Sequence, residues 1–536
     1  MIENVKAFFT PEVAFQGVHW HSGGLGVFSE AMLSSAKHLG IPMVGVTILP
    51  RQGYYDQRKN DKGMKICYES RYYDHILEKT ELKFSIPIAS TSVWIEVLHL
   101  PSRVFNTCDL YLLDTDISEN DFLSRTNTLQ LYGGSRESGA NMDRKIVQSL
   151  VLGVGGMEAL KRLGISVSLY HLNESHTFFA ALAVLKEFLA ENDNFKTAFE
   201  LARNKIVFTT HTPVRAGNPE YDLNTIMRLG TFNQTFRYEE LLGIGGDPFN
   251  MTAACLRMAR KANAVSKKHR DTAEKLWHWV EGKAPIIYIT NGTDCRYWQF
   301  EEFRIAETQS MMAEAKCAYK RKLLQYIREI TGRYLSENIF TIGWARRFEE
   351  YKRPKLLFYD WGWIRAKLIS NHIQIVMAGK PHPDNYLMIE MCNELHHLSR
   401  ELPNIVFLAG YDLEMSKIMK AGVDLWLNTP RVPDEACGTS GMSAAMNGAI
   451  NASTPDGWIC EANSDNCFIF GYRHTAVDQD AYDAEELKKC LEQAAEIFYN
   501  EKEQWYEKAL RAKREAEQIW TSDRMAAQYD EFLYAD

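Results

Sequence analysis

Short apolar runs rich in β-branched and aromatic residues alternate with amphipathic segments along most of the chain. The amphipathic segments Phe178–Leu189, Thr252–Lys267 and Arg353–Ile369 predict helices. The apolar runs predict buried strands at Val5–Phe9, Met43–Leu49, Val167–Leu172, Ile206–Thr210, Ile286–Thr290, Ile339–Trp344, Ile373–Ala378, Ile405–Ala409 and Val423–Leu427. This alternation is typical of α/β proteins, in which crossover helices join parallel strands.

The chain has 536 residues, which is more than one hydrophobic core usually organises. We expect two Rossmann-like domains, residues 1–295 and 296–485, with a ligand site in the cleft between them. The remaining residues, 486–536, form a helical pattern that begins at Leu487 and is capped again at Thr521–Met525. We expect these helices to cross back and pack on the first domain.

Composition narrows the classes of function. The formal net charge of −8 argues against a nucleic-acid partner. The ten cysteines are scattered, without metal-ligand or disulfide spacing, which favours reduced thiols and no metal site. No signal-peptide layout and no apolar run of membrane-spanning length is visible, so we expect a cytoplasmic protein without a membrane partner. The sequence leaves the oligomeric state open, a homodimer included.

The stretch 434–443 follows a predicted strand and precedes a run of small residues, 444–449, that predicts a helix. A carboxylate, Glu435, therefore lies at a strand end close to a helix N-terminus, where backbone N–H groups attract anions. We expect Glu435 to hold sugar hydroxyls while the N–H groups hold a phosphate. The alternative is an ordinary turn with Glu435 as a solvated cap.

Other polar motifs follow other predicted strands or open a helix. Four cations lie within eight residues at 346–353, and such a cluster is suited to phosphate. The other motifs are His21–Gly26, His171–His176, Thr209–Val214 and Ile289–Asp294, and Tyr132–Glu137 is consistent with a plain turn. Polar side chains at three successive strand ends favour a site over isolated turns.

These motifs, in this order, resemble the α-glucan (glycogen/maltodextrin) phosphorylases of the short bacterial type. The resemblance also includes 428–431, 435–447 and 522–525, and it extends over nearly the whole chain. It implies the GT-B architecture of two Rossmann-like domains and a retaining hexosyltransferase activity on α-glucans.

The resemblance assigns roles to matching positions around the sugar. It implies that the main-chain carbonyl of His211 faces the anomeric carbon, and that Asn291 and Glu435 hold glucose hydroxyls. It also places the backbone N–H of Gly438 on the sugar donor, and we add His176 as a sugar-binding residue.

The resemblance also assigns the phosphate-binding positions. Gly23 and Gly24 would form the loop over the donor phosphate. Arg347 and Lys352 would bind the substrate or leaving phosphate, and Arg346 with the N–H groups near Thr439 would bind the cofactor phosphate.

One position departs from the family pattern. The family carries pyridoxal phosphate (PLP) as a Schiff base on a lysine eight residues after the glutamate, where this chain has Ser443. A hydroxyl cannot form an imine, so no covalent cofactor is expected. Related nucleotide-sugar transferases often carry an acidic ribose-binding residue at the same spacing. Ser443 would leave room for a nucleotide and could bind its ribose.

Three functions follow. The first is a PLP-independent retaining glycosyltransferase that takes a glucosyl-type group from a nucleotide diphosphate sugar and transfers it to a carbohydrate acceptor. The second is an α-glucan phosphorylase that holds PLP noncovalently and releases glucose 1-phosphate. The third is a non-catalytic glucan-binding or regulatory protein.

Overall fold

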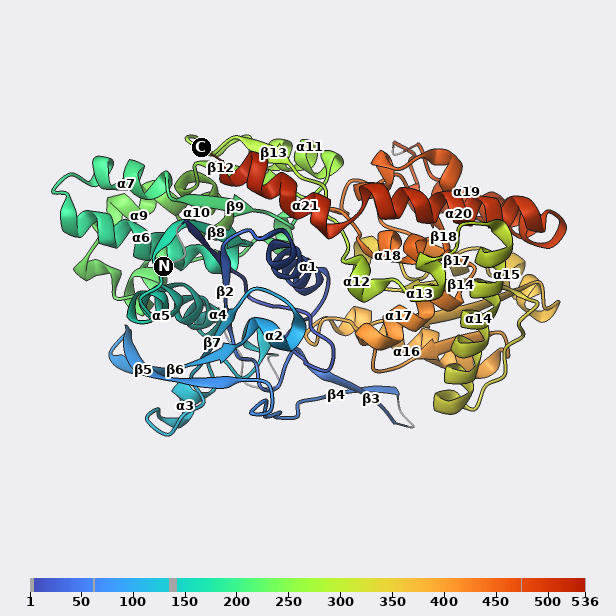
Figure 1. Cartoon of the computed structure of the whole chain (residues 1–536), viewed down its shortest axis with the longest axis horizontal. Helices are drawn as coiled ribbons and strands as arrows, with labels where there is room; N and C mark the ends of the chain where they lie inside the picture. The colour runs from blue at the N-terminus through green and yellow to red at the C-terminus, as the bar shows by residue number, and fades with distance from the viewer. Residues whose placement is uncertain (1–3, 61–62, 135–141, 474, 536) are drawn as a thin grey trace. The chain divides into compact units, whose positions relative to one another are not determined.

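The computed structural model describes residues 4–60, 63–134, 142–473 and 475–535. The chain divides into two compact units (Figure 1). Unit 1 comprises Met1–Tyr55, Tyr68–Thr290 and Asp523–Asp536, and unit 2 comprises Asp56–Cys67 and Asn291–Ser522. Each unit is built around one large sheet.

The sheet of unit 1 has nine strands and is parallel from β13 to β7, whereas β6 runs antiparallel to both β7 and β5. Its spatial order is β13 (Ile286–Tyr288), β12 (Lys261–Ala264), β9 (Ile206–Thr209), β8 (Val167–Asn173), β1 (Val5–Phe9), β2 (Met43–Ile48), β7 (Leu110–Asp114), β6 (Thr91–Leu100) and β5 (Glu78–Ile88). A second pair, β10 (Glu220–Tyr221) and β11 (Phe249–Asn250), is antiparallel.

Helices connect these strands, as the parallel topology requires. The helices of this unit are α1 (Gly24–Leu39), α2 (Ser102–Phe105), α3 (Phe122–Arg125), α4 (Met142–Leu150), α5 (Gly156–Arg162), α6 (Phe178–Glu191), α7 (Phe195–Arg203), α8 (Leu223–Leu229), α9 (Tyr238–Gly245), α10 (Met251–Met258), α11 (Lys267–Leu276) and α21 (Ser522–Gln528).

The sheet of unit 2 is parallel throughout. Its order is β16 (Ile405–Leu408), β15 (Ile373–Ala378), β14 (Phe340–Ala345), β17 (Leu425–Asn428), β18 (Ile450–Ser453) and β19 (Phe468–Ile469). Its helices are α12 (Cys295–Trp298), α13 (Glu301–Arg304), α14 (Gln309–Thr331), α15 (Trp361–Ile369), α16 (Tyr386–Glu401), α17 (Leu413–Gly422), α18 (Ser440–Met446), α19 (Gln479–Asn500) and α20 (Lys502–Ile519). Strands β14 to β18 are buried along their whole length, as expected for a sheet covered on both faces.

The predicted α/β class is confirmed, and each of the nine predicted strands is present within two residues of its expected ends. The prediction of one helix over Thr252–Lys267 is wrong. The structure ends α10 at Met258, inserts the buried strand β12 and begins α11 at Lys267. The alanines of this segment are compatible with both the helical and the strand repeat of apolar positions. Pairing with β9 and β13 makes residues 261–264 a strand.

The C-terminal helices do not all pack as expected. Helices α19 and α20 stay with unit 2, because Leu491, Phe498 and Trp505 join its hydrophobic core. Only Asp523–Asp536 returns to unit 1, where Met525 and Tyr529 are fully buried. The domain boundary at 295/296 shifts to 290/291.

A further difference is the hairpin formed by β3 (Asp56–Asn60) and β4 (Gly63–Cys67), which belongs to unit 2 although unit 1 flanks it in the chain. The backbone N–H of Met64 donates to Oδ1 of Asn393 on α16 at 2.7 Å. The pattern of apolar and polar residues did not predict that this hairpin belongs to unit 2.

Candidate functional site

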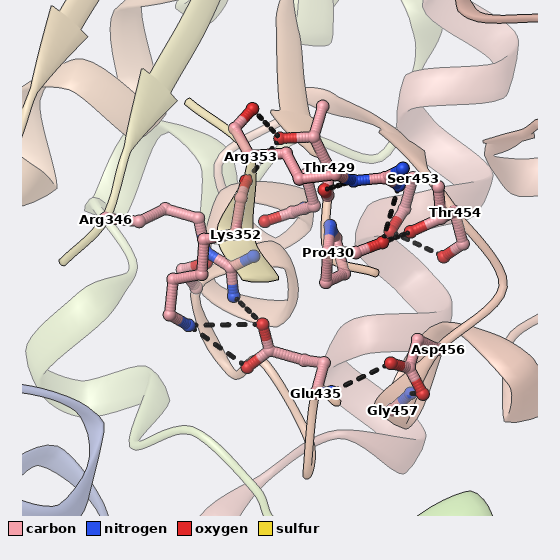
Figure 2. A network of polar contacts seen from close by, with 12 residues as sticks. Arg346, Lys352, Arg353, Thr429, Pro430, Glu435, Ser453, Thr454, Asp456 and Gly457 are labelled. Carbon is pink, nitrogen blue, oxygen red and sulfur yellow. Dashed lines mark hydrogen bonds and ion pairs between the residues drawn. The ribbon is translucent and has the colours of Figure 1, made fainter. Parts of the chain in front are cut away.

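In unit 2, the ends of two neighbouring parallel strands bring a carboxylate and two cations together. Arg346 follows β14, Lys352 ends the short helix η7 (Glu350–Lys352), and Glu435 lies beyond the end of β17, which pairs with β14. Oε2 of Glu435 accepts a hydrogen bond from Nη2 of Arg346 at 2.6 Å and one from Nζ of Lys352 at 3.2 Å (Figure 2). All three side chains are buried. We call them the cation–carboxylate cluster.

The backbone around Glu435 is fixed by further contacts (Figure 2). Its N–H donates to Oδ2 of Asp456 at 2.8 Å. Gly438 has φ +84°, a left-handed conformation that favours glycine. Arg353 donates from Nε to the carbonyl of Thr429 and from Nη2 to that of Pro430, both at 2.9 Å. The loop that carries Glu435 is therefore held at both ends.

The charges of the cluster do not cancel, because two cations face one carboxylate. Burial and the charge of Arg346 together lower the pKa of Lys352 to about 8, against the opposing effect of Glu435. Burial raises the pKa of Glu435, but the charges of Arg346 and Lys352 outweigh burial and lower it overall. Nη1 of Arg346 is buried, and no hydrogen-bond partner for it occurs in the described parts of the chain. The cluster can therefore accept a further anion.

Three other predicted positions lie beside this cluster in the chain. Arg347 is 40% exposed and pairs with Glu349 at 3.7 Å, so its guanidinium is partnered outside the buried cluster. Thr439 immediately precedes α18, and Ser443 lies within that helix. Oγ of Ser443 donates to the carbonyl of Ser440 at 3.2 Å. The hydroxyl is thus bonded to its own helix.

Asn291 opens the second segment of unit 2, and its side chain is buried. Two residues later, Oγ1 of Thr293 lies 3.7 Å from Sδ of Met442 on α18. The structure therefore places this segment against the helix that carries Ser443. The sugar-binding role of Asn291 stays a prediction.

In unit 1, the ends of β8 and β9 form a second polar group. Nε2 of His211 lies 2.8 Å from Oδ1 of Asn173. The carboxylate of Glu174 accepts hydrogen bonds from the backbone N–H of His211 at 2.9 Å and from Oγ1 of Thr212 at 3.0 Å. Burial lowers the pKa of His211 well below its ordinary value, so the ring is neutral.

Glu174, which supports this polar group, has a strained backbone conformation. Its φ of 72° and ψ of 158° are in a region that non-glycine residues rarely adopt, and the carboxylate is buried. Burial raises its pKa, although the hydrogen bonds from His211, Ser175 and Thr212 oppose that shift. Such strain persists only where neighbouring contacts enforce it, and it is concentrated at functional sites.

The glycine loop is organised by a residue that the motif did not include. Glu12 accepts hydrogen bonds from the backbone N–H groups of Ser22 and Gly26, the latter at 3.2 Å. Gly23 is the N-cap of α1 and Gly24 is its first residue. A Cβ on Gly24 would meet no atom within 4 Å, so the loop is open at that point.

The remaining histidines differ in their surroundings. His176 packs edge-on against Tyr132, with ring centroids 5.1 Å apart, and burial lowers its pKa to about 4. His171, which opens the His171–His176 motif, is buried between Tyr534 and Thr209 in the core of unit 1. The last residues of the Tyr132–Glu137 motif, 135–137, lie outside the described residues.

Sequence reasoning missed Glu12 as the support of the glycine loop. It also missed Glu174 as a support of the polar group in unit 1, and Arg353 and Asp456 as supports of the cation–carboxylate cluster. Glu174 lies within the motif at 171–176 and Arg353 within the cation cluster at 346–353. A charged residue close to the end of a predicted buried strand was the signal that could have identified both. Nothing in the local pattern around Glu12 or Asp456 indicates which backbone N–H groups they accept from.

Comparisons with known proteins define the class. Residues 299–535 match the carbohydrate phosphorylase family. An uncharacterised protein of Methanocaldococcus jannaschii is 38% identical, over 98% of this chain and 99% of its own length. A maltodextrin phosphorylase of Thermococcus litoralis is 31% identical, over 96% of this chain and 68% of its own. A glycogen synthase of Chlorobaculum parvum is 24% identical, over 91% and 90% respectively.

The parallel α/β units and these matches agree on the class. The chain belongs to the carbohydrate phosphorylase family. Among the described residues, no helix is long and apolar enough to span a membrane.

Proposed function

We propose that the protein is a retaining glycosyltransferase of α-glucans that uses a nucleotide diphosphate sugar and works without imine-linked PLP. The observation that carries the proposal is that unit 2 contains both the cation–carboxylate cluster and a serine, Ser443, at the cofactor position. A cation cluster suited to phosphate is present, whereas the position that the family resemblance assigns to the cofactor's lysine is a serine. A cytoplasmic location belongs to the same proposal.

The residues at α18 do not fit covalent PLP. Ser443 offers a hydroxyl where an amine is needed, and that hydroxyl donates to the Ser440 carbonyl within the helix. We therefore derive no catalytic step through this cofactor. Ser443 would instead lie near the distal part of a nucleotide donor, as would Thr439.

The cluster suits a diphosphate leaving group. Transfer breaks the bond between the anomeric carbon and a phosphate oxygen, forms a bond to the acceptor hydroxyl, and gives the hydroxyl proton to the leaving phosphate. Arg346 and Lys352 would neutralise the charge that develops on this phosphate, with Arg347 as a further cation. Displacement of the carboxylate by the phosphate would free Glu435 for sugar hydroxyls, beside the Gly438 N–H. The proposed roles of Asn291, His176, His211, Gly23 and Gly24 are those that the family resemblance implies.

Calorimetric titration with UDP-, ADP- and GDP-glucose tests the proposal. We expect one of them to bind with a dissociation constant below millimolar, and Lys352→Met to weaken that binding at least tenfold. The preferred donor should then extend maltodextrin chains. Absence of binding by all three at millimolar concentration would exclude a nucleotide donor of this kind.

A second function is favoured by family membership, since one relative is named a maltodextrin phosphorylase. This is phosphorolysis of an α-glucan to glucose 1-phosphate with noncovalent PLP. It requires cofactor absorbance in the purified protein and glucose 1-phosphate from maltodextrin and phosphate. The match to a glycogen synthase supports the synthetic alternative.

A third function, glucan binding without catalysis, predicts carbohydrate binding but no turnover with any donor. The buried cation–carboxylate cluster argues against it, because burying two cations beside a single carboxylate is costly and gives a pure glucan binder no advantage.

A further inference from the structure

The hairpin β3–β4 inserts one polar side chain, Gln57, at the carboxyl edge of the unit 2 sheet. Oε1 of Gln57 accepts a hydrogen bond from the backbone N–H of Gly410 at 3.0 Å. Nε2 donates to the carbonyl of Gly379 at 3.1 Å. Gln57 is only 7% exposed, so this amide is a buried link between two backbone segments.

The two segments are the turns that follow neighbouring strands. Gly379 comes directly after β15, and Gly410 lies two residues after the end of β16, which pairs with β15 in parallel. Carboxyl ends of parallel strands are where open α/β sheets bind ligands. Here one carboxamide ties two of these ends together.

The turn at Gly379 is in direct contact with the backbone of Arg346. The N–H of Arg346 donates to the Ala378 carbonyl at 3.3 Å, and that of Phe348 donates to the Lys380 carbonyl at 3.0 Å. Gly379 adopts φ +149°, and a Cβ added there would lie 1.9 Å from the Arg346 carbonyl oxygen. The position of the Gly379 turn therefore sets the position of the Arg346 backbone.

We propose that Gln57 is a positioning residue for the cation–carboxylate cluster, acting through Gly379 on Arg346. The inference rests on the proposed function, because it assigns Arg346 to the binding of the leaving phosphate. By fixing the Gly379 turn, Gln57 holds the Arg346 guanidinium where it meets both Glu435 and an incoming anion.

Anchoring of the hairpin alone does not require this amide. The Met64 N–H and the Asn393 side chain already bind the hairpin to α16. The Gln57 amide instead uses its acceptor and its main donor contact on strand-end turns, while Nε2 also lies 3.7 Å from Sγ of Cys392 on α16. Loss of the amide should loosen the turns while the hairpin stays docked.

The test is a double-mutant cycle on the full chain with inorganic diphosphate as the probe. Gln57→Leu introduces an apolar side chain of similar size and removes the hydrogen bonds of the amide. We expect a dissociation constant about five- to tenfold higher, which lies within the range over which residues without ligand contact modulate binding. In an Arg346→Met background, Gln57→Leu should have no further effect, because its route runs through Arg346.

Gln52→Leu is the matched control. It makes the same chemical change a few residues earlier in the chain, where the amide bonds Ser70 and Gln130 in unit 1. It should leave diphosphate affinity unchanged. Gln57→Asn, which retains the amide on a shorter stem, should give a smaller loss than Gln57→Leu.

Unchanged or tighter diphosphate binding in folded Gln57→Leu would overturn the inference and leave the proposed function standing. Equal effects of Gln57→Leu with and without Arg346 would overturn it as well, since the residue would then act elsewhere. If the wild-type chain bound no diphosphate at millimolar concentration, the proposed function itself would fail, and the inference with it.

Discussion

At the scale of single residues, Glu435 occupies the place that we propose for a bound anion. Its carboxylate meets Arg346 at 2.6 Å and Lys352 at 3.2 Å, and it is buried with them. A doubly charged phosphate presents more charge to the same cations, and Nη1 of Arg346 supplies a further buried donor. We therefore expect a bound anion to replace the Glu435 carboxylate as the partner of Arg346 and Lys352.

Lys352 makes this exchange sensitive to pH. Its pKa of about 8 means that it is protonated below that value and neutral above it. We expect the affinity for sulfate, whose charge stays constant, to fall as pH rises from 7 to 9.5. Titration calorimetry at half-unit steps measures the fall. Lys352→Arg should flatten the profile, because a guanidinium stays charged throughout; an equally steep profile in that variant would assign the titration to another group.

At the scale of elements, one arginine joins the loop before Glu435 to helix α19. Arg353 donates to the carbonyls of Thr429 and Pro430 and pairs with Asp483 at 2.7 Å. Its side chain is 4% exposed and that of Asp483 is 2% exposed. Removing one partner of such a pair leaves an uncompensated buried charge.

Arg353→Met is therefore expected to destabilise unit 2 by about 3–5 kcal/mol. Urea denaturation followed by tryptophan fluorescence measures the change in the free energy of unfolding. Arg431→Met is the control, because Arg431 is 46% exposed and pairs with Asp480 at the surface. It should cost less than about 1 kcal/mol. Equal losses in the two variants would show that the buried pair contributes no more than the exposed one.

The sequence predicted elements better than their assignment to units. Strand runs such as Ile373–Ala378 were found because burial on both faces leaves an almost continuous apolar signal. Strand-end position predicted a phosphate site beside Glu435, and the clustered cations at 346–353 predicted one for that segment. The sequence could not show which of Arg346 and Arg347 joins the buried cluster, because the direction of a side chain after a strand depends on tertiary packing. Gln57 gave no local signal, because its partners are more than 300 positions away.

At the scale of the whole molecule, each of the two units is assembled from segments that are not contiguous in sequence. Met525 is fully buried in the core of unit 1, and Leu491 is fully buried in that of unit 2. Each unit depends on a segment distant in sequence from the rest of it. Stability should therefore divide by unit rather than by position along the chain.

Two mirrored substitutions test this division. Met525→Ala should lower the stability of unit 1 by about 2–5 kcal/mol, and Leu491→Ala should lower that of unit 2 by a similar amount. Hydrogen exchange followed by mass spectrometry reports on both sheets at once. We expect Met525→Ala to accelerate exchange in β8 and β12 but not in β14 and β15, and Leu491→Ala to do the reverse. Acceleration of both sheets by either variant would indicate a single cooperative unit.

The assignment of Asp56–Cys67 to unit 2 and of Asp523–Asp536 to unit 1 has a consequence for synthesis. The chain changes unit four times, so the first unit to be started is the last to be completed. Met525 and Tyr529 leave the ribosome only after unit 2 has been made, and until then unit 1 exposes the surface that they cover. The β3–β4 hairpin, in turn, can dock only after α16 has been synthesised. Folding in strict order from the N-terminus is thus excluded, and nascent chains released early should be targets for chaperones.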